Sequence, residues 1–80
     1  MVVEVKIYAN LAYYVKFSER FLKGERLDIG EGTTAGQILE MIHIPPQISV
    51  VILVNGSHAE RKKVLKNGDV VHIIPPMTGG

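Results

Sequence analysis

The chain has 80 residues, a hydrophobic fraction of 46% and a formal net charge of +1. This length fits a single domain, and the hydrophobic fraction is sufficient for one core. The sequence contains no cysteine, which excludes disulfides, thiolate metal sites and a catalytic thiol. Its small net charge gives no reason to expect nucleic acid or an anionic membrane as a partner. No signal peptide or membrane span is visible, so we expect a cytoplasmic protein.

The first third of the chain predicts two short strands separated by a segment without a clear period. Residues 3–7 alternate apolar and polar side chains, as a half-buried strand does. Residues 10–24 fit no single period, and we expect a loop there with about one helical turn. A second strand is expected around residues 27–29, paired antiparallel with the first.

The clearest local signal is the start of a helix. Thr34 and Gln37 have the spacing of a capping box, in which each side chain bonds a backbone N–H at the helix start. Apolar residues then recur on one helical face: Ala35, Ile38, Leu39 and Ile42. The segment His43-Ile44-Pro45-Pro46 is expected to stop the helix, because a residue that precedes proline avoids the α region. A helix of about two and a half turns does not persist alone, so we expect it to pack on a sheet.

Three further strands are expected in the second half of the chain. Residues 50–54 are all apolar and are followed by the turn pair Asn55-Gly56. A brief strand is expected around residues 58–61. The turn at residues 67–69 precedes a last strand over residues 70–74, which is apolar in both phases except at His72.

A sheet with a single helix has only one covered face, so the architecture predicted is α+β, with four or five strands. One phase of the two most apolar strands is expected to face the helix: Ile52, Val54, Val71 and Ile73. The other phase is expected on the uncovered face, where a contiguous apolar patch is typical of a partner surface: Val51, Leu53, His72 and Ile74. The alternative is that the long loop buries both faces.

The chain ends in a segment that is unlike the rest. Pro75 and Pro76 end the last strand because proline has no N–H to donate. We expect residues 1–76 to form the domain and residues 77–80 to form a mobile tail. Neither Gly79 nor Gly80 has a Cβ, so the backbone and its carboxylate can enter a very narrow slot. A chance pair of glycines is the alternative.

Four pieces of sequence, taken together, resemble the MoaD/ThiS sulfur-carrier family, whose members have the ubiquitin-like β-grasp fold. The ending is more similar to the small subunit of molybdopterin synthase than to the thiamine carrier. The resemblance covers residues 32–80 and rests on these segments: Gly32-Thr33-Thr34, Val54-Asn55-Gly56, Leu65-Lys66-Asn67-Gly68-Asp69 and Pro75-Pro76-Met77-Thr78-Gly79-Gly80.

The resemblance implies a carrier that has no active site of its own. An E1-like enzyme would use ATP to adenylate the carboxylate of Gly80, and a sulfur donor would convert it to a thiocarboxylate. The large subunit of a synthase would then receive the tail and take the sulfur. The resemblance gives the recognition of the tail to its remaining residues: Gly79, Thr78, Met77 and Pro76. It implies no bound cofactor.

Other chemistry has little support in the sequence. His43, His58 and His72 stand apart from each other and from carboxylates, so we assign no metal site. No serine has a motif that would place it beside a base. The alternatives left open are a carrier for thiamine or cysteine synthesis, a ubiquitin-like protein modifier, and a β-grasp interaction module without carrier chemistry.

Overall fold

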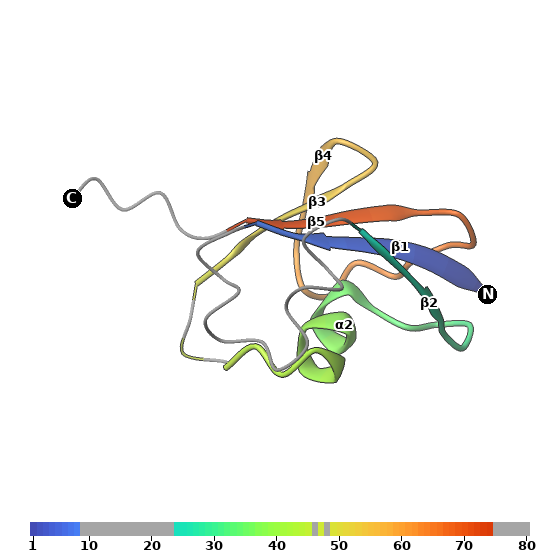
Figure 1. The fold of residues 1–80 in the computed structure, drawn as a ribbon, viewed down its shortest axis with the longest axis horizontal. Helices are drawn as coiled ribbons and strands as arrows, with labels where there is room; N and C mark the ends of the chain where they lie inside the picture. Colours follow the sequence, from blue (N-terminus) through green and yellow to red (C-terminus); the bar gives the residue numbers. More distant parts are fainter. Residues whose placement is uncertain (9–23, 46, 48, 75–80) are drawn as a thin grey trace.

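The computed structural model describes residues 1–8, 24–45, 47 and 49–74. These residues form one five-stranded sheet with a single helix below it (Figure 1). The elements in chain order are β1 (Val2–Ile7), β2 (Glu25–Asp28), α2 (Ala35–Met41), β3 (Val51–Val54), β4 (Ser57–Ala59) and β5 (Val70–Ile74). Within the described residues, no helix is long and apolar enough to cross a membrane.

The strands lie in the order β2-β1-β5-β3-β4, and the pairing is mixed. β1 pairs with β2 antiparallel, as expected, and with β5 in parallel. β3 pairs antiparallel with both β5 and β4. The two strands that are apolar in both phases, β3 and β5, therefore lie inside the sheet, where both of their edges are hydrogen-bonded.

The core lies between the sheet and α2, and its phase is the one predicted. Ile52 and Val54 of β3 are 3% and 6% exposed, and Val71 and Ile73 of β5 are fully buried. They pack in one cluster with the apolar face of the helix and with the buried phase of β1. The other members of this cluster follow from the same periodicities or come from the loops: Val3, Val5, Ile7, Ile29, Ala35, Ile38, Leu39, Ile42, Ile44 and Leu65.

The start of α2 has the predicted capping box. The Gln37 N–H donates to Thr34 Oγ1 at 3.2 Å, and the Thr34 N–H donates to Gln37 Oε1 at 2.8 Å. Two backbone N–H groups that the first helical turn leaves without partners are satisfied in this way.

The end of α2 differs from the expectation. The helix has seven residues, close to two turns, and its C-cap is Ile42, three residues before Pro45. His43 adopts a left-handed conformation with φ of 65°. Its N–H donates to the Glu40 carbonyl and the Ile44 N–H donates to the Leu39 carbonyl, which is the hydrogen-bond pattern of a Schellman motif. The helix therefore ends with a backbone hydrogen-bonded cap at His43, and the prolines that follow are not needed to end it.

Several strand boundaries also differ from the expectation. β2 begins at Glu25 and ends before Ile29, whose N–H donates to the Met1 carbonyl beyond the strand. β3 begins at Val51, one residue later than expected, and β4 lies at 57–59, earlier than the expected 58–61. The β3–β4 turn is as predicted: Asn55 and Gly56 both have positive φ, which makes this two-residue loop a type I′ turn. The loop expected over residues 10–24 lies outside the described residues except for Gly24.

Candidate functional site

The described chain reaches Ile74, the residue from which the glycine-rich segment continues. The tail residues singled out above, 76–80, lie outside the described residues, as does the expected boundary of the domain at residue 76. The structure therefore describes the surface next to the root of the tail, at the carboxyl end of β5 (Figure 1).

The sheet face opposite α2 brings together all four residues predicted for the partner surface. Val51 lies opposite Ile74, and Leu53 lies opposite His72, in the antiparallel β3–β5 ladder. All four side chains are half-buried, and each alternates with a buried neighbour. Side chains opposite one another on the same face of a sheet lie in contact range. They therefore form a continuous block, which we call the docking face, and it reaches the root of the tail.

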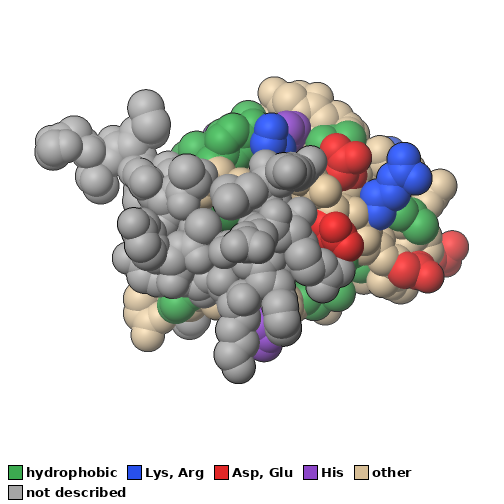
Figure 2. All heavy atoms as spheres, viewed as in Figure 1, with side chains coloured by type: hydrophobic (Ala, Val, Ile, Leu, Met, Phe, Trp, Pro, Cys, Tyr) green, Lys and Arg blue, Asp and Glu red, His purple; other side chains and the backbone are tan. Residues whose placement is uncertain are grey.

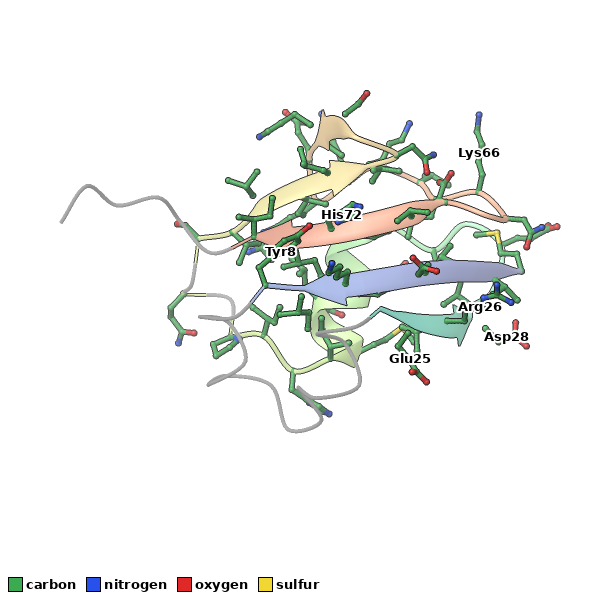
Figure 3. The ribbon with its side chains drawn as sticks, turned by 45° about the horizontal axis from the view of Figure 1, so that its top comes forward. Tyr8, Glu25, Arg26, Asp28, Lys66 and His72 are labelled. Atoms are coloured by element: carbon green, nitrogen blue, oxygen red, sulfur yellow. The ribbon has the colours of Figure 1, made fainter. Side chains whose placement is uncertain are left out.

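The docking face continues onto β1, which the sequence reading did not include. Lys6 lies opposite His72 in the parallel β1–β5 ladder. The Tyr8 hydroxyl is 3.1 Å from His72 Nδ1, and both side chains rise from the same face of the sheet (Figure 3). Lys6 Nζ lies 5.3 Å from the centre of the Tyr8 ring, within cation–π range. Alternation in residues 3–7 marks Lys6 as outward-facing, but only the parallel pairing places it beside a residue 66 positions later.

A row of four cross-strand neighbours consequently crosses the sheet, and three of its side chains bear nitrogen. Lys6, His72, Leu53 and His58 are successive cross-strand neighbours on β1, β5, β3 and β4. Figure 2 shows apolar side chains next to a basic side chain and a histidine along the upper edge of the view. The docking face is therefore apolar near the tail root and at Leu53, and polar on both sides of Leu53 along this row.

The opposite end of β5 is held by a buried carboxylate. Asp69 is 8% exposed, and its two oxygens accept from the Lys66 N–H and from Asn55 Nδ2, each at 2.8 Å. Asn55 Oδ1 accepts in turn from the Val70 N–H at 2.9 Å. These bonds join the turn after β3 to the turn before β5, two of the segments that carry the resemblance. They satisfy the buried charge internally, so we read this cluster as structural.

A depression of about 310 Å³ lies beside that cluster, lined by side chains that include Ser57, His58, Lys63 and Lys66. It borders β4 and the start of β5, so it is remote from the end of β5 where the tail begins (Figure 3 labels Lys66). In the part of the chain that the structure describes, no three His, Asp or Glu side chains form a group that could hold a metal ion.

The chain was compared with protein families, curated proteins and solved structures. The family model described as the ThiS family matches residues 5–80. A search of curated proteins found no match.

Three solved structures are similar along nearly the whole chain. SAMP1 from Haloferax volcanii is 22% identical with a TM-score of 0.73, and each chain is covered completely. A putative molybdopterin converting factor subunit 1 from Pyrococcus furiosus is 26% identical with a TM-score of 0.68, over 96% of this chain and 99% of that one. Subunit 1 in a complex with subunit 2 of the Helicobacter pylori molybdopterin-converting factor is 22% identical with a TM-score of 0.63, with complete coverage of both. The fold is therefore the ubiquitin-like β-grasp that the resemblance implied.

Proposed function

Since the chain belongs to the ThiS family of ubiquitin-like sulfur carriers, we propose that it carries sulfur as a thiocarboxylate on Gly80 for molybdopterin synthesis. The observation that carries the proposal is that the family match runs to residue 80 and includes the terminal glycine pair. The choice of molybdopterin is supported by similarity to two proteins named as first subunits of a molybdopterin converting factor.

The proposed chemistry takes place at the chain's own carboxylate. An oxygen of the Gly80 carboxylate attacks the α-phosphorus of ATP on an E1-like enzyme, which forms an acyl adenylate and releases pyrophosphate. Hydrosulfide from a sulfur donor then attacks the acyl carbon and displaces AMP, which leaves the thiocarboxylate; a persulfide donor would give an acyl disulfide, which a thiol then reduces to the thiocarboxylate. A free carboxylate is a poor acyl donor, so this activation is required. The chain contributes no nucleophilic side chain, in keeping with the absence of cysteine from its sequence.

We assign the docking face to the two enzymes that handle the tail. The block of Val51, Leu53, His72 and Ile74 lies beside the tail root, so a partner seated on it has the tail within reach. The E1-like enzyme is the first proposed partner and a synthase large subunit is the second. The Helicobacter pylori structure, a complex of subunits 1 and 2, supports the second. If both use this face, they bind in turn.

A second candidate function is protein modification. It is favoured by the similarity to SAMP1, which is named small archaeal modifier protein 1. In that case the activated Gly80 carbonyl would be attacked by a lysine of another protein and form an isopeptide bond. Carriers for thiamine or cysteine synthesis would share the thiocarboxylate and differ only in the enzyme that accepts the sulfur.

The first prediction tests the reaction at Gly80. The protein is incubated with the E1-like enzyme encoded in the same genome, ATP and a sulfur donor, and its intact mass is measured. We expect a gain equal to the mass difference between sulfur and oxygen. Deletion of Gly80, or addition of one residue after it, should abolish the gain, because the terminal carboxylate then falls short of the adenylation site or extends past it. Gly79→Val should also reduce the mass gain, because a β-branched side chain next to Gly80 widens the tail and restricts its backbone.

Gly30→Ala is the matched control, because a Cβ at Gly30 meets no atom within 4 Å and its φ is not in the left-handed region. It should gain mass as the parent does. Normal mass gain by the extended chain, or none by the parent with an activator shown to bind it, would refute the carrier function. An isopeptide remnant of Gly80 on other proteins, without any thiocarboxylate, would favour the modifier function.

A further inference from the structure

A polar pair, His72 and Tyr8, lies on the docking face next to its apolar part. His72 is half-buried, with Leu53 opposite it on β3 and Lys6 opposite it on β1. The Tyr8 hydroxyl lies 3.1 Å from its Nδ1, and the two rings are 5.9 Å apart. A protein that covers the apolar part of this face must also remove water from the imidazole. Desolvating a polar group without a new hydrogen bond is costly, so the covering surface needs an atom that bonds to it.

The position of Tyr8 leaves one imidazole nitrogen for that bond. Nδ1 is engaged by the tyrosine hydroxyl, and within the described residues Nε2 has no hydrogen bond. The direction of the Tyr8–His72 bond depends on the tautomer of the imidazole. When the phenol donates to Nδ1, the ring hydrogen is on Nε2, and a doubly protonated ring also has a hydrogen there; a ring that donates from Nδ1 has Nε2 as an acceptor. An acceptor atom of a partner therefore complements Nε2 in the first two states, and the neighbouring charges favour such a partner atom.

Charge decides which kind of acceptor fits. Lys6 Nζ is held over the Tyr8 ring and makes no ion pair with another described residue. The acidic neighbour on the same face is Glu4, whose carboxylate lies on the β2 side of β1, since a Cβ built on Gly24 would lie 3.6 Å from Glu4 Oε2. Arg26 lies opposite Glu4 on β2. The remaining titratable side chain in the row is His58, opposite Leu53. Lys6 is thus the charged side chain that lies directly opposite His72, with the Glu4 carboxylate on the far side of β1 from it.

We propose that the partner seated on the docking face places a carboxylate over His72, where it accepts from Nε2 and faces the ammonium of Lys6. The identity of the partner rests on the proposed function, namely the E1-like enzyme. The proposed carboxylate contact itself rests on the Lys6–Tyr8–His72 geometry. The contact between His72 and the carboxylate would fix the orientation of the partner on the docking face, because apolar contacts alone do not fix it.

The second prediction compares two substitutions at His72, Gln and Glu, which are isosteric with each other. Affinity for the E1-like enzyme is measured by calorimetry in the absence of ATP. His72→Gln keeps a hydrogen-bond donor and should bind within about threefold of the parent. His72→Glu has the same shape but presents a like charge to the proposed carboxylate, and should weaken binding by about 100-fold. Because Gln and Glu differ in charge and not in size, their comparison removes the effect of packing. Thermal unfolding of both variants checks that the fold is retained.

A change at Lys6 tests the charge separately. Lys6→Gln should weaken binding by about three- to tenfold at low salt, and by less at high salt. Lys62→Gln removes the same charge from the loop after β4, where Lys62 is 88% exposed and paired with Glu60 at 3.4 Å. It should leave the affinity unchanged.

Equal affinities of the Gln and Glu variants would overturn the proposal, as would equal effects of Lys6→Gln and Lys62→Gln. Tighter binding by His72→Phe would likewise show that the covering surface is wholly apolar. These results would leave the carrier function intact, because sulfur transfer to Gly80 is read separately from the mass gain. A failure of the mass gain with normal binding would instead count against the carrier function alone.

Discussion

At the scale of single residues, the most informative position is His43. It closes α2 with φ of 65°, a conformation that glycine adopts freely and other L-residues adopt at a cost. Our third prediction is that His43→Gly stabilises the protein by about 0.5–1 kcal/mol, the relief of strain exceeding the added entropy of the unfolded chain. The midpoint of urea unfolding should rise with an unchanged slope.

The sign of the effect should reverse inside the helix. Glu40 is exposed on α2 and has helical geometry, so Glu40→Gly should lower stability by about 1 kcal/mol. A fall in the midpoint for His43→Gly would show that the His43 side chain contributes more than its backbone conformation costs.

Residue-scale features could be predicted only where the signal is local. The Thr34–Gln37 capping box was read correctly because both partners lie within one helical turn. The left-handed His43 was missed because histidine, although enriched at positive φ, adopts it too seldom to predict it, and the following prolines offered a sufficient reason for the helix to stop. The bond between Asn55 and Asp69 was missed because both lie in turns that only the β3–β5 pairing brings together.

At the scale of elements, strand phase was predictable because burial follows the alternation of side chains. Ile52 and Leu53 are neighbours on β3, yet one is 3% exposed in the core and the other is half-buried on the docking face. Our fourth prediction compares Ile52→Asp with Leu53→Asp. The first places an unpaired charge in the core and should unfold the domain, whereas the second should leave a cooperative unfolding transition.

Circular dichroism and thermal unfolding would distinguish the two variants, and binding to the E1-like enzyme would then be measured for the folded one. Leu53→Asp should bind much more weakly than the parent, because a charge at the apolar part of the docking face is desolvated on contact. Normal binding would remove the docking face from the proposed function. Unfolding by Leu53→Asp would show that Leu53 contributes to the core despite its phase.

Element boundaries were less predictable than phase. β4 and the start of β2 were displaced from their expected positions because short strands end where pairing ends, and pairing depends on the partner strand. No period within residues 57–66 distinguishes a three-residue strand from the loop that follows it.

At the scale of the whole molecule, the central pairing joins the two ends of the chain. β1 and β5 are parallel neighbours in the middle of the sheet, although most of the sequence separates them. Periodicity predicted that these strands exist, but it has no information on which strands pair. The expected fold depended on the resemblance, whose segments mark the turns that bring β3 and β5 together. The extension of the docking face onto Lys6 and Tyr8 follows from that pairing and needed the structure.

The last prediction separates docking from chemistry. Every buried hydrophobic residue of the described core lies between Val3 and Ile73, so a chain truncated after Ile74 should fold. It retains the docking face and lacks the carboxylate of Gly80. We therefore expect it to gain no sulfur and to inhibit the mass gain of the full chain competitively, at concentrations near its own dissociation constant for the E1-like enzyme. The same truncation carrying Leu53→Asp is the control and should not inhibit. If the truncated chain folds and still fails to compete, then recognition resides in residues 75–80, and the docking face has no part in activation.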